Sequence, residues 1–401
     1  MKKLGVVIVG LNGAVATTLI AGVELMVKGL VPRFGMLTEK SSVSGTDTIV
    51  DGLDMVPLEG FVFGGWDLRF SNTFEGALTH GVFTADKLAP VKSQLEKVTA
   101  WPAVVPKNTK LTGNIVKAGS MREQIAAIKQ NVTDFKKAHG LDEVVMVNLM
   151  STEPYLVECD IHKKLADFDK ALDANDSSIN ASMLYLYAAN ELQVPYLNFT
   201  PSLSNVPALT EHAEKSKNPI CGMDGKTGQT LLKTALASVF RLRRLFIEGW
   251  YSTNILGNND GAVLADPESN KTKVMSKASV LDSIVGYPVE NHQVHIHYYK
   301  PRGDSKEAWD NIDLQGFGGI PMQMKLDFLC QDSALAAPLV VDMVRFLAVA
   351  KAHGESGIQR QLSLFFKSPY AKEGETPEHD LFKQEQMLRT WTDKVANKAK
   401  R

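Results

Sequence analysis

Two short stretches of the chain gather basic side chains around few acids. Asn270–Leu281 contains Lys273 and Lys277, which are four residues apart and would share one face of a helix. The run K-P-R-G-D-S-K adds Lys300, Arg302, Asp304 and Lys306. Like charges this close repel one another, whereas a dianionic phosphate or a developing oxyanion would attract them all. The pattern therefore predicts a site for such an anion.

A further lysine stands in an unusual place. Lys367 interrupts the apolar run L-S-L-F-F-K-S-P, Leu362–Pro369. Burial lowers the pKa of a lysine, which suits it for proton transfer. Most lysines are simply solvated, so a wet helix face remains the alternative interpretation for the group around Lys273.

The first element that would position such a site lies at the start of the chain. The apolar run Leu4–Val9 predicts a buried parallel strand, and Ala14–Lys28 predicts a helix that stops at Gly29. The turn between them resembles a dinucleotide fingerprint with asparagine in place of its second glycine. A plain strand–helix turn is the alternative. The residues that would meet a pyrophosphate are Gly10, Asn12, Gly13, Thr17 and Thr18.

Two acids compete for the ribose-binding position of such a fold. Glu39 follows Phe34–Leu37, which we expect to be the second strand. Asp67 follows a third short run, Phe61–Phe63. Either acid alone is equally consistent with a solvated loop residue.

Strands and helices alternate through the first half of the chain. We expect helices at Ser120–His139 and Ser178–Leu192, and strands at Glu143–Leu149 and Tyr196–Phe199. Thr152 follows one of these strands and would face the cofactor. Such alternation predicts a doubly wound parallel sheet with helices on both faces.

The texture changes after about Thr200. A long helix, Gln229–Gly249, precedes four strand-like runs: Tyr251–Leu256, Gln293–Tyr299, Ile312–Phe317 and Met322–Leu329. This pattern predicts an α+β segment on an antiparallel or mixed sheet. Helices are expected again at Ala334–Ala352 and Leu381–Lys400, whereas Pro219–Thr230 reads as a loop that caps the long helix.

Composition narrows the class of protein. The net charge of −1 in 401 residues argues against a bulk grip on nucleic acid or on an anionic membrane. The three cysteines are far apart, show no zinc spacing and fit a reducing cytoplasm. His295 and His297 would share one face of a strand, but no third ligand with clear spacing follows, so we expect no metal site.

Several motifs together resemble the inositol-3-phosphate synthase family, also called myo-inositol-1-phosphate synthase. They extend over most of the chain: G-G-W-D, Y-L-N-F-T-P-S-L-S-N-V-P, G-Q-T, L-G-N-N-D-G, S-K-A-S-V, K-P-R-G-D-S-K and D-S-A-L-A-A-P-L-V-V-D. The resemblance implies an α/β fold in which a Rossmann-type sheet is interrupted by an α+β insertion for catalysis and tetramer contacts. We place the first Rossmann part at 1–218, the insertion at 219–324 and the return at 325–401.

The resemblance also implies a reaction. D-Glucose 6-phosphate would bind beside NAD, be oxidised at C5, enolise by loss of a C6 proton, close its ring onto C1 and be reduced again. Another NAD-dependent sugar-phosphate cyclase or oxidoreductase, or a non-catalytic nucleotide sensor, remains the alternative. A monovalent or divalent cation is open, and a homotetramer is implied.

Matched residue by residue, the family pattern assigns roles. Lys273 and Lys367 would exchange the proton at C5, and Lys277 and Lys306 would hold the oxyanion and the phosphate. Asp304 and Asp332 fall on active-site acids. Asp260 joins the cofactor group, and the substrate contacts would be Asn205, Asn258, Asn259, Ser276 and Ser279.

Overall fold

A computed structural model describes residues 2–39, 49–105, 111–257 and 281–399, and it contains two β-sheets. The larger sheet has seven strands, all parallel, in the order β11-β6-β5-β4-β1-β2-β3. Its strands are β1 (Leu4–Val9), β2 (Phe61–Asp67), β3 (Trp101–Pro102), β4 (Glu143–Asn148), β5 (Tyr196–Asn198), β6 (Pro219–Gly222) and β11 (Gly357–Ile358).

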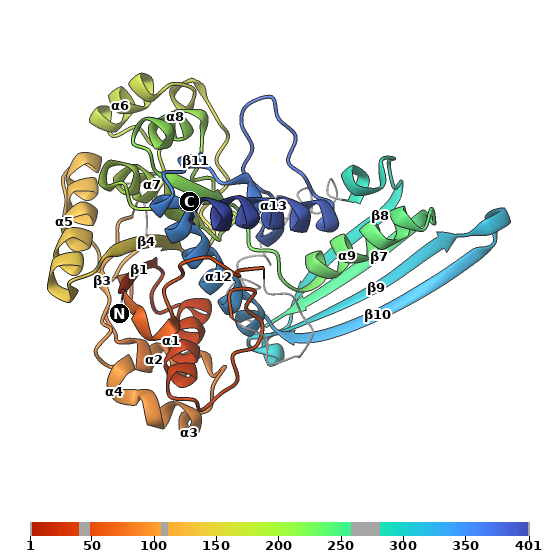
Figure 1. Cartoon of the computed structure of the whole chain (residues 1–401), viewed down its shortest axis with the longest axis horizontal. Coiled ribbons are helices and arrows are strands. Elements are labelled where there is room, and N and C mark those ends of the chain that lie inside the picture. The colour runs from red at the N-terminus through yellow and green to blue at the C-terminus, as the bar shows by residue number, and fades with distance from the viewer. Residues whose placement is uncertain (1, 40–48, 106–110, 258–280, 400–401) are drawn as a thin grey trace.

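Helices cover both faces of this sheet (Figure 1). Residues of β1 alternate between two cores, since Val6 and Ile8 join one cluster, and Val7 and Val9 join the other. The helices of this part are α1 (Ala14–Val27), α2 (Thr73–His80), α3 (Ala85–Leu88), α4 (Lys92–Leu95), α5 (Met121–His139), α6 (Leu165–Ala174), α7 (Ala181–Leu192), α8 (Pro207–Lys215), α12 (Asp332–Ala352) and α13 (Leu381–Ala399).

Helix α12 packs in the core beside α1. By length and composition alone it could cross a membrane, but most of it is buried against the rest of the protein, as in the core helix of a globular domain. It begins directly after the last strand of the second sheet. The site described below lies at this joint.

The second sheet has four strands in the order β10-β9-β7-β8. These are β7 (Phe246–Leu256), β8 (Asn291–Tyr298), β9 (Ser305–Gln315) and β10 (Pro321–Gln331). Strands β7 and β8 pair parallel and the other pairs are antiparallel, so the sheet is mixed. Helix α9 (Gly228–Leu242) packs on one face, and the long strands β9 and β10 project away from the larger sheet (Figure 1).

The structure confirms the predicted α/β fold, with a parallel sheet interrupted by an α+β segment. Helix α5 begins after Ser120, whose hydroxyl caps the helix, and ends before Gly140 in the left-handed conformation. The sheets divide the chain at other residues than we predicted. Strand β6 still belongs to the larger sheet, and β10 belongs to the smaller one, so the second sheet's part runs from α9 to Gln331.

The expected second strand at Phe34–Leu37 is wrong. The backbone N–H groups of Leu37 and Thr38 donate to the buried carboxylate of Asp342 at 2.8 and 2.9 Å, so no strand ladder uses them. Glu39 forms ion pairs with Arg33 and Arg345 instead of ending a strand. The strand beside β1 is β2, which extends the run at Phe61–Phe63 through the glycines to Asp67.

Two further predicted boundaries were wrong. The long helix ends at Leu242 rather than Gly249, because Arg244 adopts a left-handed conformation and the chain then enters β7. The apolar run carried no glycine or proline to mark that stop. Pro219–Gly222, expected in a loop, forms β6 between β5 and β11.

We predict that Asp342→Ala will lower the free energy of unfolding by about 1–3 kcal/mol, because two backbone N–H groups and the Thr38 hydroxyl would lose a buried acceptor. Urea unfolding measures this loss. The matched control is Asp393→Ala at an exposed position of α13. Equal loss in both variants would contradict the assigned role of Asp342.

Candidate active site

The loop between β6 and α9 carries the first acid–amine contact of the site. Asp224 lies in this loop, and its carboxylate accepts a hydrogen bond from Lys367 Nζ at 2.8 Å. Both side chains are about one-tenth exposed. The two segments are also joined through their backbones, since Lys367 N donates to Asp224 O at 2.7 Å. The ammonium is therefore held firmly in a poorly solvated place.

A second acid–amine contact lies at the far end of the same loop. Lys306, near the start of β9, places Nζ 3.5 Å from Asp332 Oδ2, at the first residue of α12. The Thr227 hydroxyl donates to the other oxygen of that carboxylate at 3.1 Å. The Lys306 chain passes beside Gly228, where a Cβ would lie 3.7 Å from Lys306 Cδ. The first turn of α9 therefore lies next to an ammonium.

That first turn suits an anion for a second reason. Thr227 precedes α9 but its hydroxyl does not cap the helix, so the N–H groups of Gly228 and Gln229 receive no cap from it. A helix N-terminus with a neighbouring ammonium attracts phosphate.

Asp304 ties the loop before β9 to α12. Its carboxylate accepts hydrogen bonds from Ser333 N at 3.2 Å and Ser333 Oγ at 2.8 Å. Burial raises the pKa of Asp304, and the hydrogen bonds from Ser333 oppose that rise. His80 is near enough to lower the same pKa, and its Nε2 lies 2.9 Å from Asn12 O. Asp304 thus feels the charge of a histidine that contacts the glycine turn.

The glycine turn is held by Asp67. Its carboxylate accepts from Asn12 N at 2.8 Å, and the Asn12 side chain donates to Ser71 O at 3.1 Å. Gly10 has φ +88°, and a Cβ there would lie 2.9 Å from Leu149 O, so a side chain would be strained. Of the two competing acids, Asp67 stands at the carboxyl end of the strand beside β1.

The turn fits a dinucleotide in part. The buried oxygens Asn12 Oδ1 and Thr18 Oγ1 make no hydrogen bond within the described chain, so both could accept a partner from a ligand, and the hydroxyl could also donate. The start of α1, after Gly13, supplies further N–H donors. The Thr17 hydroxyl donates to Gly13 O at 2.9 Å within the helix, so its contact with phosphate stays a prediction.

The remaining predicted residues are placed as follows. Thr152 follows β4 at the carboxyl edge of the sheet, where Glu153 binds the first amides of α7. Asn205 accepts from Thr210 Oγ1 at 3.0 Å. The other predicted cofactor, substrate and catalytic residues lie outside the described residues: Asn258, Asn259, Asp260, Lys273, Ser276, Lys277 and Ser279.

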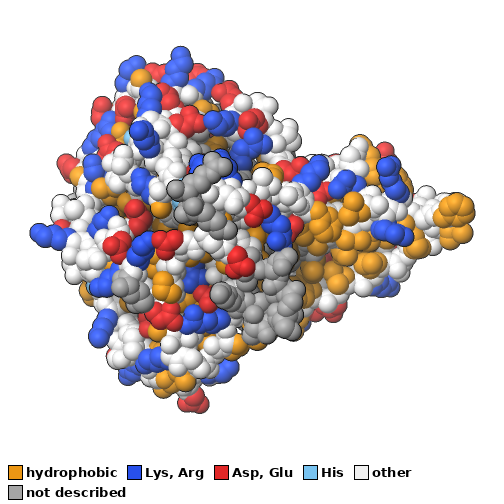
Figure 2. All heavy atoms as spheres, viewed as in Figure 1, with side chains coloured by type: hydrophobic (Ala, Val, Ile, Leu, Met, Phe, Trp, Pro, Cys, Tyr) orange, Lys and Arg blue, Asp and Glu red, His pale blue; other side chains and the backbone are white. Residues whose placement is uncertain are grey.

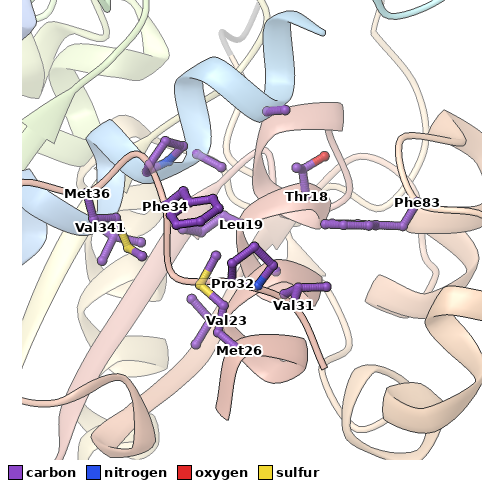
Figure 3. Close-up of a pocket in the computed structure, with 14 residues that line it drawn as sticks. Thr18, Leu19, Val23, Met26, Val31, Pro32, Phe34, Met36, Phe83 and Val341 are labelled. Atoms are coloured by element: carbon purple, nitrogen blue, oxygen red, sulfur yellow. The ribbon is translucent and has the colours of Figure 1, made fainter. Parts of the chain in front are cut away.

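An apolar pocket of about 190 Å³ lies between α1 and α12 (Figure 3). Its lining includes Thr18, Phe34, Phe83 and Val341, but none of the described acids and lysines above. The pocket thus shares Thr18 with the glycine turn, but not the acids and lysines of the charged site. Among the described residues, no group of three His, Cys, Asp or Glu side chains converges as a metal site would require.

Known proteins resemble this chain over almost its whole length. Residues 4–392 match the family model described as myo-inositol-1-phosphate synthase. The chain belongs to this family. An inositol-3-phosphate synthase of Bacteroides thetaiotaomicron is 42% identical over 96% of this chain and 94% of its own length. One of Oryza sativa is 29% identical over 97% of this chain and 85% of its own.

Solved structures share the fold. An inositol-3-phosphate synthase of Caenorhabditis elegans has a TM-score of 0.90 at 24% identity, covering 98% of this chain and 86% of its own. A myo-inositol-1-phosphate synthase-related protein of Thermotoga maritima has a TM-score of 0.77 at 22% identity, covering 98% of both chains. Both solved structures thus share the overall fold of this chain, a parallel sheet joined to a smaller mixed sheet.

Sequence reasoning missed two residues of this member of the family. Asp224 and Thr227 stand in D-G-K-T, which we had read only as a capping loop. Asp224 has φ +59°, a conformation that asparagine, aspartate and glycine tolerate best, so an aspartate beside glycines was a weak signal. In the folded chain, Asp224 contacts Lys367. Thr227 and Lys306 both contact the carboxylate of Asp332.

Lys226, in the same loop, is fully buried and donates to Gln384 Oε1 of α13 at 2.6 Å. Burial lowers its pKa to about 7. Between that value and the ordinary lysine pKa, the folded state binds fewer protons than the unfolded state. The contribution of Lys226 to the free energy of unfolding therefore rises with pH in this interval.

We predict that Lys226→Met will remove this rise. The free energy of unfolding of the wild type, minus that of the variant, should increase between pH 6.5 and pH 9. Urea unfolding at the two pH values checks the sign. Lys137→Met, at an exposed position of α5, should show no such trend. A difference that is independent of pH would mean that Lys226 keeps an ordinary pKa.

Proposed function

We propose that this protein is an inositol-3-phosphate synthase, which converts D-glucose 6-phosphate to 1D-myo-inositol 3-phosphate as an NAD-dependent isomerase. The observation that carries the proposal is the pair of acid–amine contacts at one loop, Lys367–Asp224 and Lys306–Asp332. The 42% identical relative bears the same activity in its name. Family membership and chemistry support the same conclusion.

The residues of the chain suggest a division of work. Lys367, in its neutral amine form, would take the proton from the C5 hydroxyl, Asp224 would hold the ammonium that results, and the proton would return to the oxygen on C5 at the end of the cycle. Lys306 and the first turn of α9 would bind the phosphate, and Lys306 would also stabilise negative charge on the sugar oxygens. Preorganised cations are effective here because the site is poorly solvated. Lys273 and Lys277 remain proposed partners.

NAD, when bound, would supply the acceptor for hydride from C5 and return that hydride in the last step. Gly10, Asn12, Gly13 and Thr18 would hold its phosphates, and Asp67 would keep their turn in shape. Asp260, Thr152 and Thr17 complete the proposed set. A monovalent or divalent cation is a further proposal without an assigned ligand, and we place the enzyme in the cytoplasm.

One assay separates the proposed activity from its rivals. The protein is incubated with glucose 6-phosphate and catalytic NAD, and inositol phosphate is sought by phosphorus NMR. Net release of NADH would instead indicate a simple dehydrogenase. Cofactor binding without any product would indicate a sensor and overturn the proposal.

Variants test the two amines. We predict that Lys367→Met and Lys306→Ala each lower turnover about 10²–10³-fold, the usual loss for a preorganised oxyanion partner. Lys137→Met on α5 serves as the matched surface control. Circular dichroism and NAD affinity establish that each variant is folded. Near-normal turnover in Lys306→Ala would refute its role.

We also propose that the enzyme is a homotetramer assembled through the second sheet. Its face away from α9 exposes large apolar side chains, among them Tyr251 and Trp309 (47–48% exposed) and Leu329 (60% exposed). Figure 2 shows apolar side chains gathered along this projecting part. An exposed apolar area of this kind is typical of a contact between subunits.

A charge on that face should prevent assembly. We predict that Trp309→Glu, measured by light scattering after gel filtration, yields smaller species than the wild type. Lys137→Gln, on the exposed side of α5, lowers the net charge by one just as Trp309→Glu does and so controls for that change. If the wild type is itself a monomer, or if Trp309→Glu leaves its mass unchanged, the proposed interface is wrong.

A further inference from the structure

A buried polar network lies under the second sheet, next to the first turn of α9, which we propose binds the phosphate. It runs between α9 and strands β7, β8 and β9. Its members are buried or half-buried, and none was singled out as a site residue from the sequence: Gln229, Lys233, Trp250, Ser252, Asn254, His292 and Asp310.

Asp310 is the centre of this network. Its Oδ1 accepts from Trp250 Nε1 and from Ser252 Oγ, both at 2.7 Å, and its Oδ2 accepts from Gln229 Nε2 at 3.0 Å. Donors from α9 and β7 therefore converge on one buried carboxylate.

Lys233 supplies the opposite charge. Its Nζ lies 3.2 Å from Ser252 Oγ, 2.6 Å from His292 Nε2 and 5.4 Å from the centre of the Trp250 ring. Ser252 thus bridges the ammonium and the carboxylate of Asp310. Burial lowers the pKa of Lys233 to about 8, and the charge of Asp310 opposes that fall. The amine is therefore mostly protonated at neutral pH.

The carboxylate sets the direction of the next hydrogen bonds. Gln229 turns its amide nitrogen, the donor end of the amide, towards the Asp310 carboxylate. Gln229 Oε1 then accepts from Asn254 Nδ2. With its nitrogen used, Asn254 keeps an amide oxygen that is buried and makes no hydrogen bond to any residue in the described ranges.

The register places Asn254 two residue pairs away from Lys306 on the second sheet. Strand β7 pairs Leu256 with Lys306, Asn254 with Ala308 and Ser252 with Asp310. Side chains two apart on a strand share a face, so Lys306 and Asp310 lie on the same side, with only the small Ala308 between them. Gln229 is the second residue of α9, next to Gly228 and the Lys306 chain.

We propose that Lys233 and Asp310 are positioning residues: they fix the amides of Gln229 and Asn254 so that the Asn254 oxygen accepts a hydrogen bond from a hydroxyl of the sugar phosphate. The inference rests on the proposed synthase activity, which it extends from phosphate binding to recognition of the sugar. A buried acceptor without a partner is costly, and a substrate hydroxyl would offset that cost.

The test compares Asp310→Asn with Asp313→Asn. Asp313 lies on the same strand, where Asn311 and Gln323 donate to it, outside the network. In Asp310→Asn the new amide can donate to Gln229, so the direction of both amides is no longer fixed. We expect the KM for glucose 6-phosphate to rise about tenfold, the value of one hydrogen bond, with kcat changed less. Inorganic phosphate carries no sugar hydroxyl and would bind mainly through acceptor oxygens. Its inhibition constant as a competitor of glucose 6-phosphate should therefore change less than twofold.

A double variant separates positioning from stability. Lys233→Met alone leaves the charge of Asp310 uncompensated and should destabilise the fold. Lys233→Met with Asp310→Asn removes both charges, so the melting temperature should recover towards the wild type while the KM stays raised. Recovery of both quantities would show a merely structural network and overturn the proposal.

The two proposals can fail separately. Calorimetric affinity for glucose 6-phosphate reports on the network even without turnover. Wild-type binding without product, weakened by Asp310→Asn, would reject the synthase activity and keep the network. Turnover by the wild type with unchanged affinity in Asp310→Asn would reject the network alone. A wild type that does not bind glucose 6-phosphate overturns both.

Discussion

The contact of Lys306 with Asp332 is the constraint on which the site depends. Lys306 belongs to the second sheet, whereas Asp332 begins the helix that packs on the first. Thr227 adds the start of α9 to the same carboxylate. If this contact is lost, three elements lose their common point. A binding geometry for a small phosphorylated sugar requires that they stay together, because the first turn of a helix attracts an anion only over a short range.

Buried ionisable side chains have shifted pKa values, and their burial also carries a desolvation cost. Lys226, Lys233 and Asp342 are all buried. Burial lowers the pKa of the two lysines and raises that of the aspartate, so it favours the neutral form of each. Each also has a polar partner from a distant part of the chain, which limits that cost. These contacts link the loop before α9 to α13, α9 to the second sheet, and Leu37 to α12. The same contacts that offset desolvation therefore also hold the active-site elements in register.

The sequence predicted the parallel sheet well because Leu4–Val9 and Glu143–Leu149 are apolar runs long enough to be buried strands. It failed at Phe34–Leu37, where a carboxylate three hundred residues away takes the backbone donors. It singled out Lys306 and Lys367 but not Asp224, because the contact of Asp224 with Lys367 forms only when two distant segments meet in the fold. Asp310 was missed for the same reason. Its hydrogen-bond partners come from α9 and β7, and no spacing of residues near Asp310 in the sequence indicates them.

Strand β10 ends at Gln331 and α12 starts at Asp332, with no connecting loop. At the other crossing, the short loop after β6 is hydrogen-bonded to the segment around Lys367. Both connections between the two sheets therefore contain residues of the candidate active site. A cut that separated the two sheets would therefore pass through the candidate active site at either crossing.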